Sequence, residues 1–220
     1  MATKTLALVH STAVVVAPLS EVARQVLPEV EVIHYCDDTL LRDVRRAGRL
    51  TPEVARRYVH YIALAEEAGA DAVMVTCSSC NRVAELAKPF VGIPVFSIDE
   101  PMAEEAVHCG CTIGVVATVP TTLEPTATLI GAKAKAEGRD VTVRTCLAER
   151  AFDRLRAGDP AGHDQLILEE VQRLAREVEV ITLAQASMAR LQPTLQAAVA
   201  VPVLVSTRSG FERARSILGL

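Results

Sequence analysis

The chain has 220 residues, of which 50% are hydrophobic, a composition that supplies a packed core and allows one large or two small domains. Its formal net charge of −4 gives no basic field, which argues against nucleic acid as a partner, and no apolar run reaches the roughly 18 residues of a membrane span. The N-terminal residues lack a signal-peptide pattern and six cysteines are too few for a disulfide scaffold, so we expect a soluble cytoplasmic protein with reduced thiols.

Strands and helices are predicted to alternate along the first half of the chain. Strands are predicted over residues 6–9, 30–35, 72–75 and 93–98, and helices over residues 11–27, 40–47, 51–68 and 99–107, with a further amphipathic stretch over residues 83–87. Thr51, Pro52 and Glu53 make a strong helix start, because they supply a cap residue, a proline at the first position and an acid in the first turn.

The same alternation returns in the second half. Strands are predicted over residues 112–117, 141–146, 180–183 and 201–205, and helices up to Ala136, over residues 150–156, from His163 onward and over residues 211–218. Residues 158–162 are predicted to form a loop, so that His163 and Asp164 open the helix that follows.

The candidate chemistry gathers around residues 71–80, Asp-Ala-Val-Met-Val-Thr-Cys-Ser-Ser-Cys. Residues 72–75 have the length of a buried parallel strand, and small polar residues follow it before a helix start. In open α/β sheets ligands bind at the carboxyl ends of strands, and a helix N-terminus both attracts anions and lowers the pKa of a cysteine. Cys77 is therefore the expected reactive thiol, beside a seat for a carboxylate or phosphate.

An internal repeat relates the two halves. Pro94 and Pro202 both stand in a Val/Ile-Pro-Val strand start, 108 residues apart. The same offset places Leu183 on Val75 and Thr118 on His10, so that one offset is expected to align three strands without gaps.

The predicted fold class is α/β, with two pseudo-symmetric Rossmann-like domains, each with a mostly parallel sheet flanked by helices, and an active site in the cleft between them. The first domain is expected to cover residues 1–99, joined by a C-terminal helix over residues 208–220, and the second to cover residues 100–207. Small polar residues that follow the strands are expected to line the cleft: Ser11, Thr12, Thr76, Ser78 and Ser79 in the first half, and Thr118, Thr121, Thr122, Gln185 and Ser187 in the second.

The sequence resembles the aspartate/glutamate/hydantoin racemase superfamily over nearly its whole length. The residues that carry the resemblance are Val75-Thr-Cys-Ser-Ser79, Gly92-Ile-Pro-Val95, Ile113-Gly-Val-Val-Ala-Thr118 with Thr121, and Ile181-Thr-Leu183. The resemblance implies two α/β domains that hold a carboxylate substrate, with one cysteine from each half facing the α-carbon, and with no metal or organic cofactor. One thiolate would remove the α-proton and the other thiol would deliver a proton to the opposite face.

The chain departs from the superfamily pattern in its second half. The repeat pairs Cys77 with Gln185, where a typical member has a second cysteine. Glutamine does not exchange protons near neutral pH, although its amide can donate hydrogen bonds to a carboxylate or enolate oxygen. The difference puts a symmetric two-thiol racemisation in doubt and leaves room for one-thiol chemistry.

His10 and Cys77 are the candidate catalytic residues. His10 is a candidate second base because it stands at a strand end, and His163 is a weaker candidate in the second half. Cys77 and Cys80 form a Cys-x-x-Cys motif that is also compatible with a redox pair or half a metal site, but no second such motif or paired histidine motif accompanies it. We therefore expect no metal.

The predicted function is that of a cofactor-independent racemase or isomerase acting on a small carboxylate or amino acid. A single-cysteine lyase, a decarboxylase or a cis-trans isomerase of a small diacid is the enzymatic alternative, and a non-catalytic carboxylate-binding protein is the alternative of another class. We expect no nucleic acid or membrane partner and a homo-oligomer, for which an arginine cluster is one candidate contact surface: Arg42, Arg45, Arg46 and Arg49.

Overall fold

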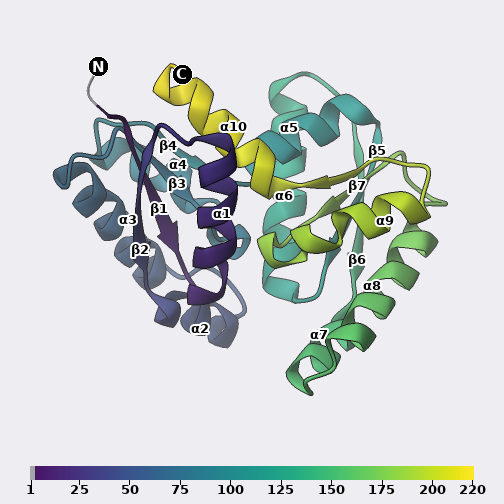
Figure 1. Cartoon of the computed structure of the whole chain (residues 1–220). Helices are drawn as coiled ribbons and strands as arrows, with labels where there is room; N and C mark the ends of the chain where they lie inside the picture. Colours follow the sequence, from purple (N-terminus) through teal and green to yellow (C-terminus); the bar gives the residue numbers. More distant parts are fainter. Residues whose placement is uncertain (1–2) are drawn as a thin grey trace. The chain divides into compact units, whose positions relative to one another are not determined.

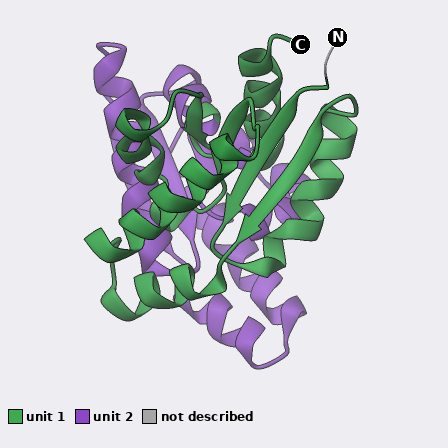
Figure 2. Ribbon diagram, turned by 90° about the vertical axis from the view of Figure 1, so that its left-hand side faces the viewer, with its two compact units in different colours: residues 1–101, 207–220 green, residues 102–206 purple. Residues whose placement is uncertain are grey.

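The computed structural model describes residues 3–220 and divides the chain into two compact units. Unit 1 consists of Met1–Pro101 together with Thr207–Leu220, and unit 2 of Met102–Ser206. Figure 2 shows the two units in different colours, with the C-terminal segment in the same colour as the N-terminal residues.

Each unit contains one four-stranded parallel sheet, and the two sheets have the same topology. In unit 1 the strand order is β2-β1-β3-β4, and in unit 2 it is β6-β5-β7-β8. The strands are β1 (Thr5–His10), β2 (Glu31–Cys36), β3 (Ala72–Val75), β4 (Val95–Ser97), β5 (Thr112–Ala117), β6 (Thr142–Leu147), β7 (Val180–Leu183) and β8 (Val203–Val205). The α/β prediction with parallel sheets is confirmed.

Helices cover both faces of each sheet (Figure 1). Those of unit 1 are α1 (Val16–Val26), α2 (Asp38–Ala47), α3 (Pro52–Glu67), α4 (Val83–Ala87), α10 (Ser206–Leu218) and the short 3-10 helices η1 (Ala13–Val15), η2 (Ser78–Cys80) and η3 (Lys88–Phe90). Those of unit 2 are α5 (Glu100–Cys109), α6 (Pro120–Ala136), α7 (Glu149–Arg156), α8 (Pro160–Leu174), α9 (Gln192–Ala198) and the 3-10 helix η4 (Ala186–Leu191).

Alternation along the strands sends neighbouring residues of the unit 1 sheet into two separate cores. Ala7 and Val9 of β1 pack with residues of α2, α3 and α4, whereas Leu6 and Leu8 pack with residues of α1 and α10. Strands buried on both faces have continuous apolar sequences. This is why the hydrophobic pattern predicted the bounds of the central strands so closely. The unit 2 sheet is covered in the same way, with α8 and α9 on one face and α5 and α6 on the other.

The expected strands over 93–98 and 201–205 are longer than the observed β4 and β8. Pro94 and Pro202 lack an N–H, so the regular ladder begins after them, although their carbonyl oxygens still accept hydrogen bonds from Val73 and Ile181.

The expected loop over 158–162 is wrong, because α8 already begins at Pro160. The Asp159 carboxylate accepts a hydrogen bond of 2.8 Å from the Gly162 N–H, and Pro160 takes the first helical position. A cap residue followed by proline is typical of a helix start. The loop was predicted because the segment is also rich in glycine and proline, which are typical of turns. His163 therefore lies inside the helix and does not open it.

The closing helix is also longer than predicted, since α10 begins at Ser206 and not at Phe211. Gly210 lies inside it, and a Cβ atom at this position would come within 2.6 Å of Ile98 Cγ1. The glycine allows the helix backbone to approach the end of the unit 1 sheet, and Phe211 and Ala214 then enter its core.

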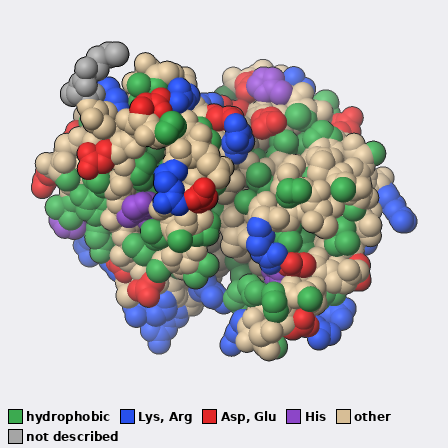
Figure 3. Space-filling view, in the orientation of Figure 1, with side chains coloured by type: hydrophobic (Ala, Val, Ile, Leu, Met, Phe, Trp, Pro, Cys, Tyr) green, Lys and Arg blue, Asp and Glu red, His purple; other side chains and the backbone are tan. Residues whose placement is uncertain are grey.

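Charged side chains are mixed over most of the face shown in Figure 3. Lys and Arg side chains gather at the lower end of unit 1, where α2 carries Arg42, Arg45 and Arg46. Among residues 3–220, no helix combines the length and the apolar character that crossing a membrane requires.

Candidate active site

The strand order of unit 1 places the predicted site residues at its topological switch point. The chain leaves β1 toward β2 on one side and reaches β3 on the other, so the carboxyl ends of β1 and β3 are where connections diverge and ligands bind in such sheets. Ser11 follows β1 and Cys77 follows β3, and the Thr76 N–H donates to the Val9 carbonyl at 3.1 Å. The fold thus brings two segments 66 residues apart in sequence into one turn region.

Cys77 occupies a hydrogen-bonded position in this region and keeps 8% of its surface exposed. A hydrogen bond with the Cys80 thiol lowers the pKa of Cys77 most strongly, burial opposes it, and the Ser11 hydroxyl, the Tyr58 hydroxyl and the Ser79 N–H add to the lowering. The net effect brings the pKa of Cys77 down to about 7. A substantial fraction of the thiol is therefore ionised at neutral pH.

The expected cause of this activation, a helix N-terminus, is a minor feature of the structure. Cys77 is followed by the three-residue 3-10 helix η2 and then by the five-residue helix α4. So short a set of aligned peptide dipoles carries little field, since the macrodipole sums over the helix. Side chains stabilise the thiolate instead, chiefly Cys80 in the same turn, with Ser11 and Tyr58 from other segments.

Tyr58 is a contributor that the sequence pattern did not single out. It lies on α3 with a fully buried side chain, and burial together with the neighbouring Cys77 and Cys80 thiols holds its own pKa well above the ordinary value. Its hydroxyl makes no hydrogen bond of standard geometry, but it is close enough to the Cys77 sulfur to favour the thiolate. The one sign of it in the sequence is a tyrosine hydroxyl on the apolar stripe that Val54 and Ile62 form.

His10 is fully buried and uses both ring nitrogens. Its Nδ1 is 2.8 Å from Thr76 Oγ1, and its Nε2 is 2.8 Å from His34 Nδ1, with the two rings stacked at 5.1 Å between centroids. Burial, followed by repulsion from His34, lowers the pKa of His10 to about 4. His10 is therefore neutral at physiological pH, and any proton that it passes must go through Thr76 or His34.

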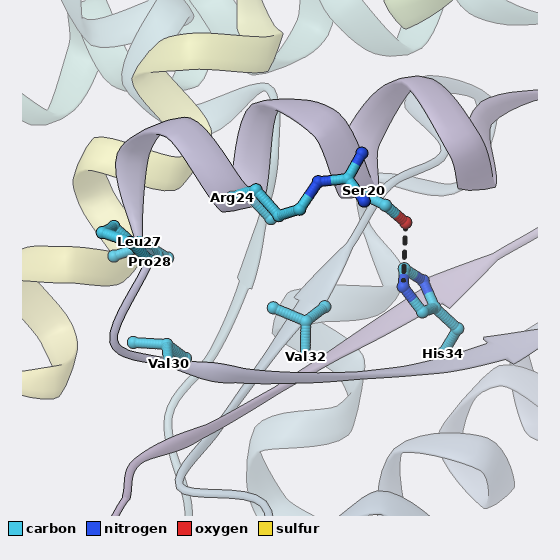
Figure 4. A pocket seen from close by; sticks show the side chains of 8 residues that line it. Ser20, Arg24, Leu27, Pro28, Val30, Val32 and His34 are labelled. Carbon is cyan, nitrogen blue, oxygen red and sulfur yellow. Dashed lines mark hydrogen bonds between the residues drawn. The ribbon is translucent and has the colours of Figure 1, made fainter.

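The chain of hydrogen bonds continues from His34 to Ser20, which lies 3.1 Å from His34 Nε2. Figure 4 shows this outer end, with Ser20 on α1 facing His34 on β2 at a hollow that Arg24 and Val32 also line. Ser20 Oγ donates to the Val16 carbonyl, and Thr76 Oγ1 donates to the Val9 carbonyl. A hydroxyl has one proton, so with both rings neutral one of these two hydroxyls keeps its bond to the carbonyl and the other donates to its histidine instead.

Unit 2 presents a second polar turn at its own switch point, between β5 and β7. Gln185 Oε1 accepts hydrogen bonds from the Thr118 N–H at 2.6 Å and from the Thr118 hydroxyl at 3.0 Å. A backbone N–H only donates, so the amide oxygen must face Thr118 and the NH₂ group must point the other way. Gln185 is thus a fixed hydrogen-bond donor.

The register of the sheets corrects the expected repeat. Val73 pairs with Val95 and Ile181 pairs with Val203, which keeps the offset of 108 for β3 and β4. Leu6 pairs with Ala72, however, and Ile113 pairs with Val180, so the offset for β1 is 107. Thr118 therefore corresponds to Ser11 and not to His10.

The corrected register gives the two turns a shared design. In unit 1 the Ser11 hydroxyl helps to lower the pKa of Cys77, and in unit 2 its counterpart Thr118 is hydrogen-bonded to Gln185. His10 corresponds to Ala117, and Thr76 corresponds to Ala184, so the histidine chain of unit 1 has no counterpart at these positions.

The other predicted binding residues differ in their surroundings. Ser78 and Ser79 are buried beside Cys77, Thr12 and Thr121 are half-buried, and Ser187 is exposed. The Thr122 hydroxyl donates to the Val119 carbonyl at 2.9 Å. His163 is buried, but its Nδ1 contacts Asp164 at 2.7 Å, and that carboxylate is held by Arg190. No cluster of three or more metal-ligating side chains occurs within residues 3–220.

Comparisons with known proteins place the chain in a family. A family model described as Asp/Glu/Hydantoin racemase matches residues 8–214. A comparison with curated proteins gives no significant match.

Solved structures share the fold at low sequence identity. An allantoin racemase from Pseudomonas fluorescens is 23% identical with a TM-score of 0.70, and the match covers 98% of this chain and 92% of that one. A glutamate racemase from Bacillus anthracis is 18% identical with a TM-score of 0.75, covering 98% and 82%. An aspartate racemase from Picrophilus torridus is 13% identical with a TM-score of 0.72, covering 98% and 94%. With the family model matching almost the whole chain, the protein belongs to the Asp/Glu/Hydantoin racemase family and is an isomerase of the racemase type.

Proposed function

We propose that the protein transfers a proton at the α-carbon of a small carboxylic acid, amino acid or related ring compound, and that Cys77 carries the proton without a cofactor. The observation that supports this proposal is the Cys77 environment, in which a nearly buried thiol has its pKa lowered to about 7 by hydrogen-bond donors. A base with a pKa near the working pH is the efficient choice, because it is deprotonated often enough and still accepts a proton readily.

In the proposed step the Cys77 thiolate removes the α-proton and becomes a neutral thiol. The electron pair of the broken C–H bond moves into the carboxylate or carbonyl group, which becomes an enediolate or enolate. Return of the proton from Cys77 restores the substrate, and delivery of a proton to the opposite face by another group gives its mirror image. The Ser11 and Tyr58 hydroxyls stabilise the thiolate before the step, so part of their effect is lost as the sulfur is protonated.

The negative oxygen that develops on the substrate needs fixed donors. We propose that the Gln185 NH₂ group is one such donor, because Thr118 holds the amide oxygen and thereby fixes where the nitrogen points. The buried Ser78 and Ser79 and the half-buried Thr12 and Thr121 are further candidates, at strand ends where small hydroxyls and N–H groups collect. Donors that are already oriented stabilise such a charge without reorganisation.

His10 is proposed to act through Thr76, by fixing the turn that precedes Cys77. Both ring nitrogens are occupied and the pKa of the ring is lowered to about 4, which does not suit a second base at neutral pH. The inverting proton transfer would therefore need a different group from the one expected from the sequence.

The class of substrate is suggested by the relatives. The similar solved structures are described as allantoin, glutamate and aspartate racemases, so their substrates define the compounds to be tried first. The test is α-proton exchange in D₂O, followed by NMR with aspartate, glutamate, allantoin, hydantoins, hydroxy acids and malonates. Cys77→Ala is the test variant and Cys111→Ser is the matched control. Cys111 is exposed and lies before the N-terminal end of β5, whereas the candidate site residues follow the carboxyl ends of strands.

Exchange with inversion that is lost in Cys77→Ala and kept in Cys111→Ser would support the proposed racemase. Exchange with retained configuration would support proton transfer at one face. Release of CO₂ from a malonate, giving one enantiomer, would replace the racemase proposal with a one-thiol decarboxylase. Exchange that persists in Cys77→Ala on an accepted substrate would overturn the role of the thiol.

A further inference from the structure

Cys77 and Cys80 are arranged as a pair of thiols within one turn. The Cys80 N–H donates to the Cys77 carbonyl at 2.9 Å, which closes a turn over four residues. Such a turn keeps its first and last Cα atoms within about 7 Å, the range that a disulfide requires. Each thiol also alters the pKa of the other, as expected of two thiols in one turn.

The two thiols differ in the way that a reactive and a resolving cysteine differ. Cys77 retains 8% exposure and ionises near neutral pH, whereas Cys80 is completely buried. The hydrogen bond with Cys77 and the burial hold the pKa of Cys80 well above its ordinary value. A thiolate with some access reacts first, and the neighbouring cysteine, once it has been deprotonated, can then attack the oxidised sulfur.

We propose that Cys77 and Cys80 form a reversible oxidation site that a hydroperoxide converts into an intramolecular disulfide. The Cys77 thiolate attacks one oxygen of hydrogen peroxide, the O–O bond breaks, and the products are a sulfenic acid and hydroxide. The hydroxide takes the proton of the Cys80 thiol and becomes water. The Cys80 thiolate then attacks the Cys77 sulfur, the S–O bond breaks, and the leaving hydroxide takes up a proton from solvent to give the second molecule of water. The pair loses two electrons and hydrogen peroxide is reduced to two molecules of water.

The remaining cysteines do not offer the same arrangement. Cys36, Cys109 and Cys111 are exposed, and the pKa of each of the first two is raised, chiefly by desolvation. Cys146 is buried in unit 2, where burial and the Glu170 carboxylate raise its pKa to about 11. Oxidation at low peroxide doses is therefore directed to Cys77.

This proposal does not depend on the proposed racemase chemistry, but it has a consequence for it. A disulfide would remove the Cys77 thiolate and would block any proton transfer that uses it. A thiol reductant would restore both cysteines. The oxidation is measured on the protein itself and not through its activity. The oxidation proposal can therefore fail while the enzymatic proposal stands, and the enzymatic proposal can fail while the oxidation proposal stands.

The test is hydrogen peroxide titration of the full chain followed by blocking of free thiols, trypsin digestion and mass spectrometry. Residues 58–82 contain no lysine or arginine before Arg82, so trypsin gives one peptide that holds Cys77 and Cys80 and no other cysteine. The expected result is that this peptide loses the mass of two hydrogens and escapes blocking, and that dithiothreitol reverses both changes. The tryptic peptide that ends at Lys133 holds both Cys109 and Cys111 and serves as an internal control for nonspecific oxidation.

Cys80→Ser and Cys77→Ser separate the two roles, and Cys80→Ala is a second variant in case a hydroxyl in this buried position impairs folding. Without the Cys80 thiol, peroxide should leave a sulfenic acid on Cys77 that dimedone traps. In Cys77→Ser, Cys80 should resist the same dose. The proposal is overturned if the wild-type peptide only gains oxygen, or if Cys77 can still be blocked after peroxide has oxidised other cysteines.

Discussion

The turn around Cys77 in unit 1 and the turn around Gln185 in unit 2 have the same position in the same sheet topology but different chemistry. Each follows the third strand of its unit and interacts with the residue after the first strand: Ser11 helps to lower the pKa of Cys77, and Thr118 donates hydrogen bonds to Gln185. Behind Cys77 lie His10 and Thr76, whereas alanines take both places in unit 2. The backbone supplies the location, and the residues behind it decide whether an ionisable or a neutral group is held there.

The largest expected effect compares Cys77→Ala with Gln185→Ala. We expect α-proton exchange to fall about 10³-fold in the first variant, because proton transfer by a positioned group contributes roughly that much. Loss of one hydrogen-bond donor to the developing oxygen should cost about 10-fold, since Gln185 is half-buried and shares the charge with other donors. Both exchange rates are measured by NMR in D₂O. Equal losses in the two variants would contradict the proposal that Cys77 transfers the proton and Gln185 only donates a hydrogen bond.

The His10 chain should make folding stability depend on pH. The pKa of His10 falls from an ordinary 6.5 to about 4 in the folded protein. The unfolded chain therefore binds more protons between these values, so stability is complete above pH 6.5 and is lost as the pH falls toward 4, by about 3 kcal/mol.

Urea unfolding at several pH values measures this dependence in wild type and in His10→Gln. The variant should lose much of the slope between pH 6.5 and 4, whatever its stability at neutral pH. His34→Gln is the companion variant, because burial also lowers the pKa of His34. An unchanged slope in His10→Gln would show that this histidine is protonated in the folded state.

Removing the Tyr58 hydroxyl should bring the pKa of the Cys77 thiol closer to that of an unperturbed cysteine. In Tyr58→Phe we expect the pKa of Cys77 to rise by about one unit, because the variant removes one group that favours the thiolate. The pH dependence of alkylation by iodoacetamide gives this pKa. Tyr61→Phe is the matched control, since the Tyr61 hydroxyl donates to Asp37. A curve for Tyr58→Phe that overlays the wild type would remove Tyr58 from the site.

The smallest expected effect comes from Gln185→Cys, which puts a thiol into the unit 2 turn. The Thr118 N–H and hydroxyl would face the new sulfur and lower its pKa by less than about one unit, because Met188 takes the place of Cys80, which lowers the pKa of Cys77 most. Alkylation in a Cys77→Ser background isolates the new thiol. A pKa as low as that of Cys77 would mean that the turn backbone alone activates a cysteine.

The sequence was sufficient for the topology and for the position of the turns. The strand predictions over 72–75, 112–117 and 180–183 match β3, β5 and β7 at every residue, because these strands are buried on both faces. The C-terminal helix and α8 were predicted to begin too late, since serine, glycine and proline at their starts resemble a loop.

The surroundings of Cys77 could not be predicted in the same way. Tyr58 lies on an ordinary apolar helix stripe and His34 on a strand, and neither is near Cys77 or His10 in sequence. Their contacts depend on how α3 packs on the sheet and on the register of β1 with β2, in which Leu8 pairs with His34. The one-residue change in the repeat also needed the registers of β1 with β3 and of β5 with β7, because β1 and β5 are buried on both faces and their apolar runs look alike after a shift of one residue.

The return of α10 to unit 1 has a consequence for the order in which the protein can fold during synthesis. Phe211, Ala214 and Leu218 belong to the same core as Leu6 and Leu19, although all of unit 2 lies between them in the chain. A ribosome therefore completes the whole of unit 2 before it supplies the last side chains of the core that was begun first. One face of the unit 1 sheet can close early, because its core uses residues 7–95 alone, whereas the other face must wait for α10 until unit 2 has been made.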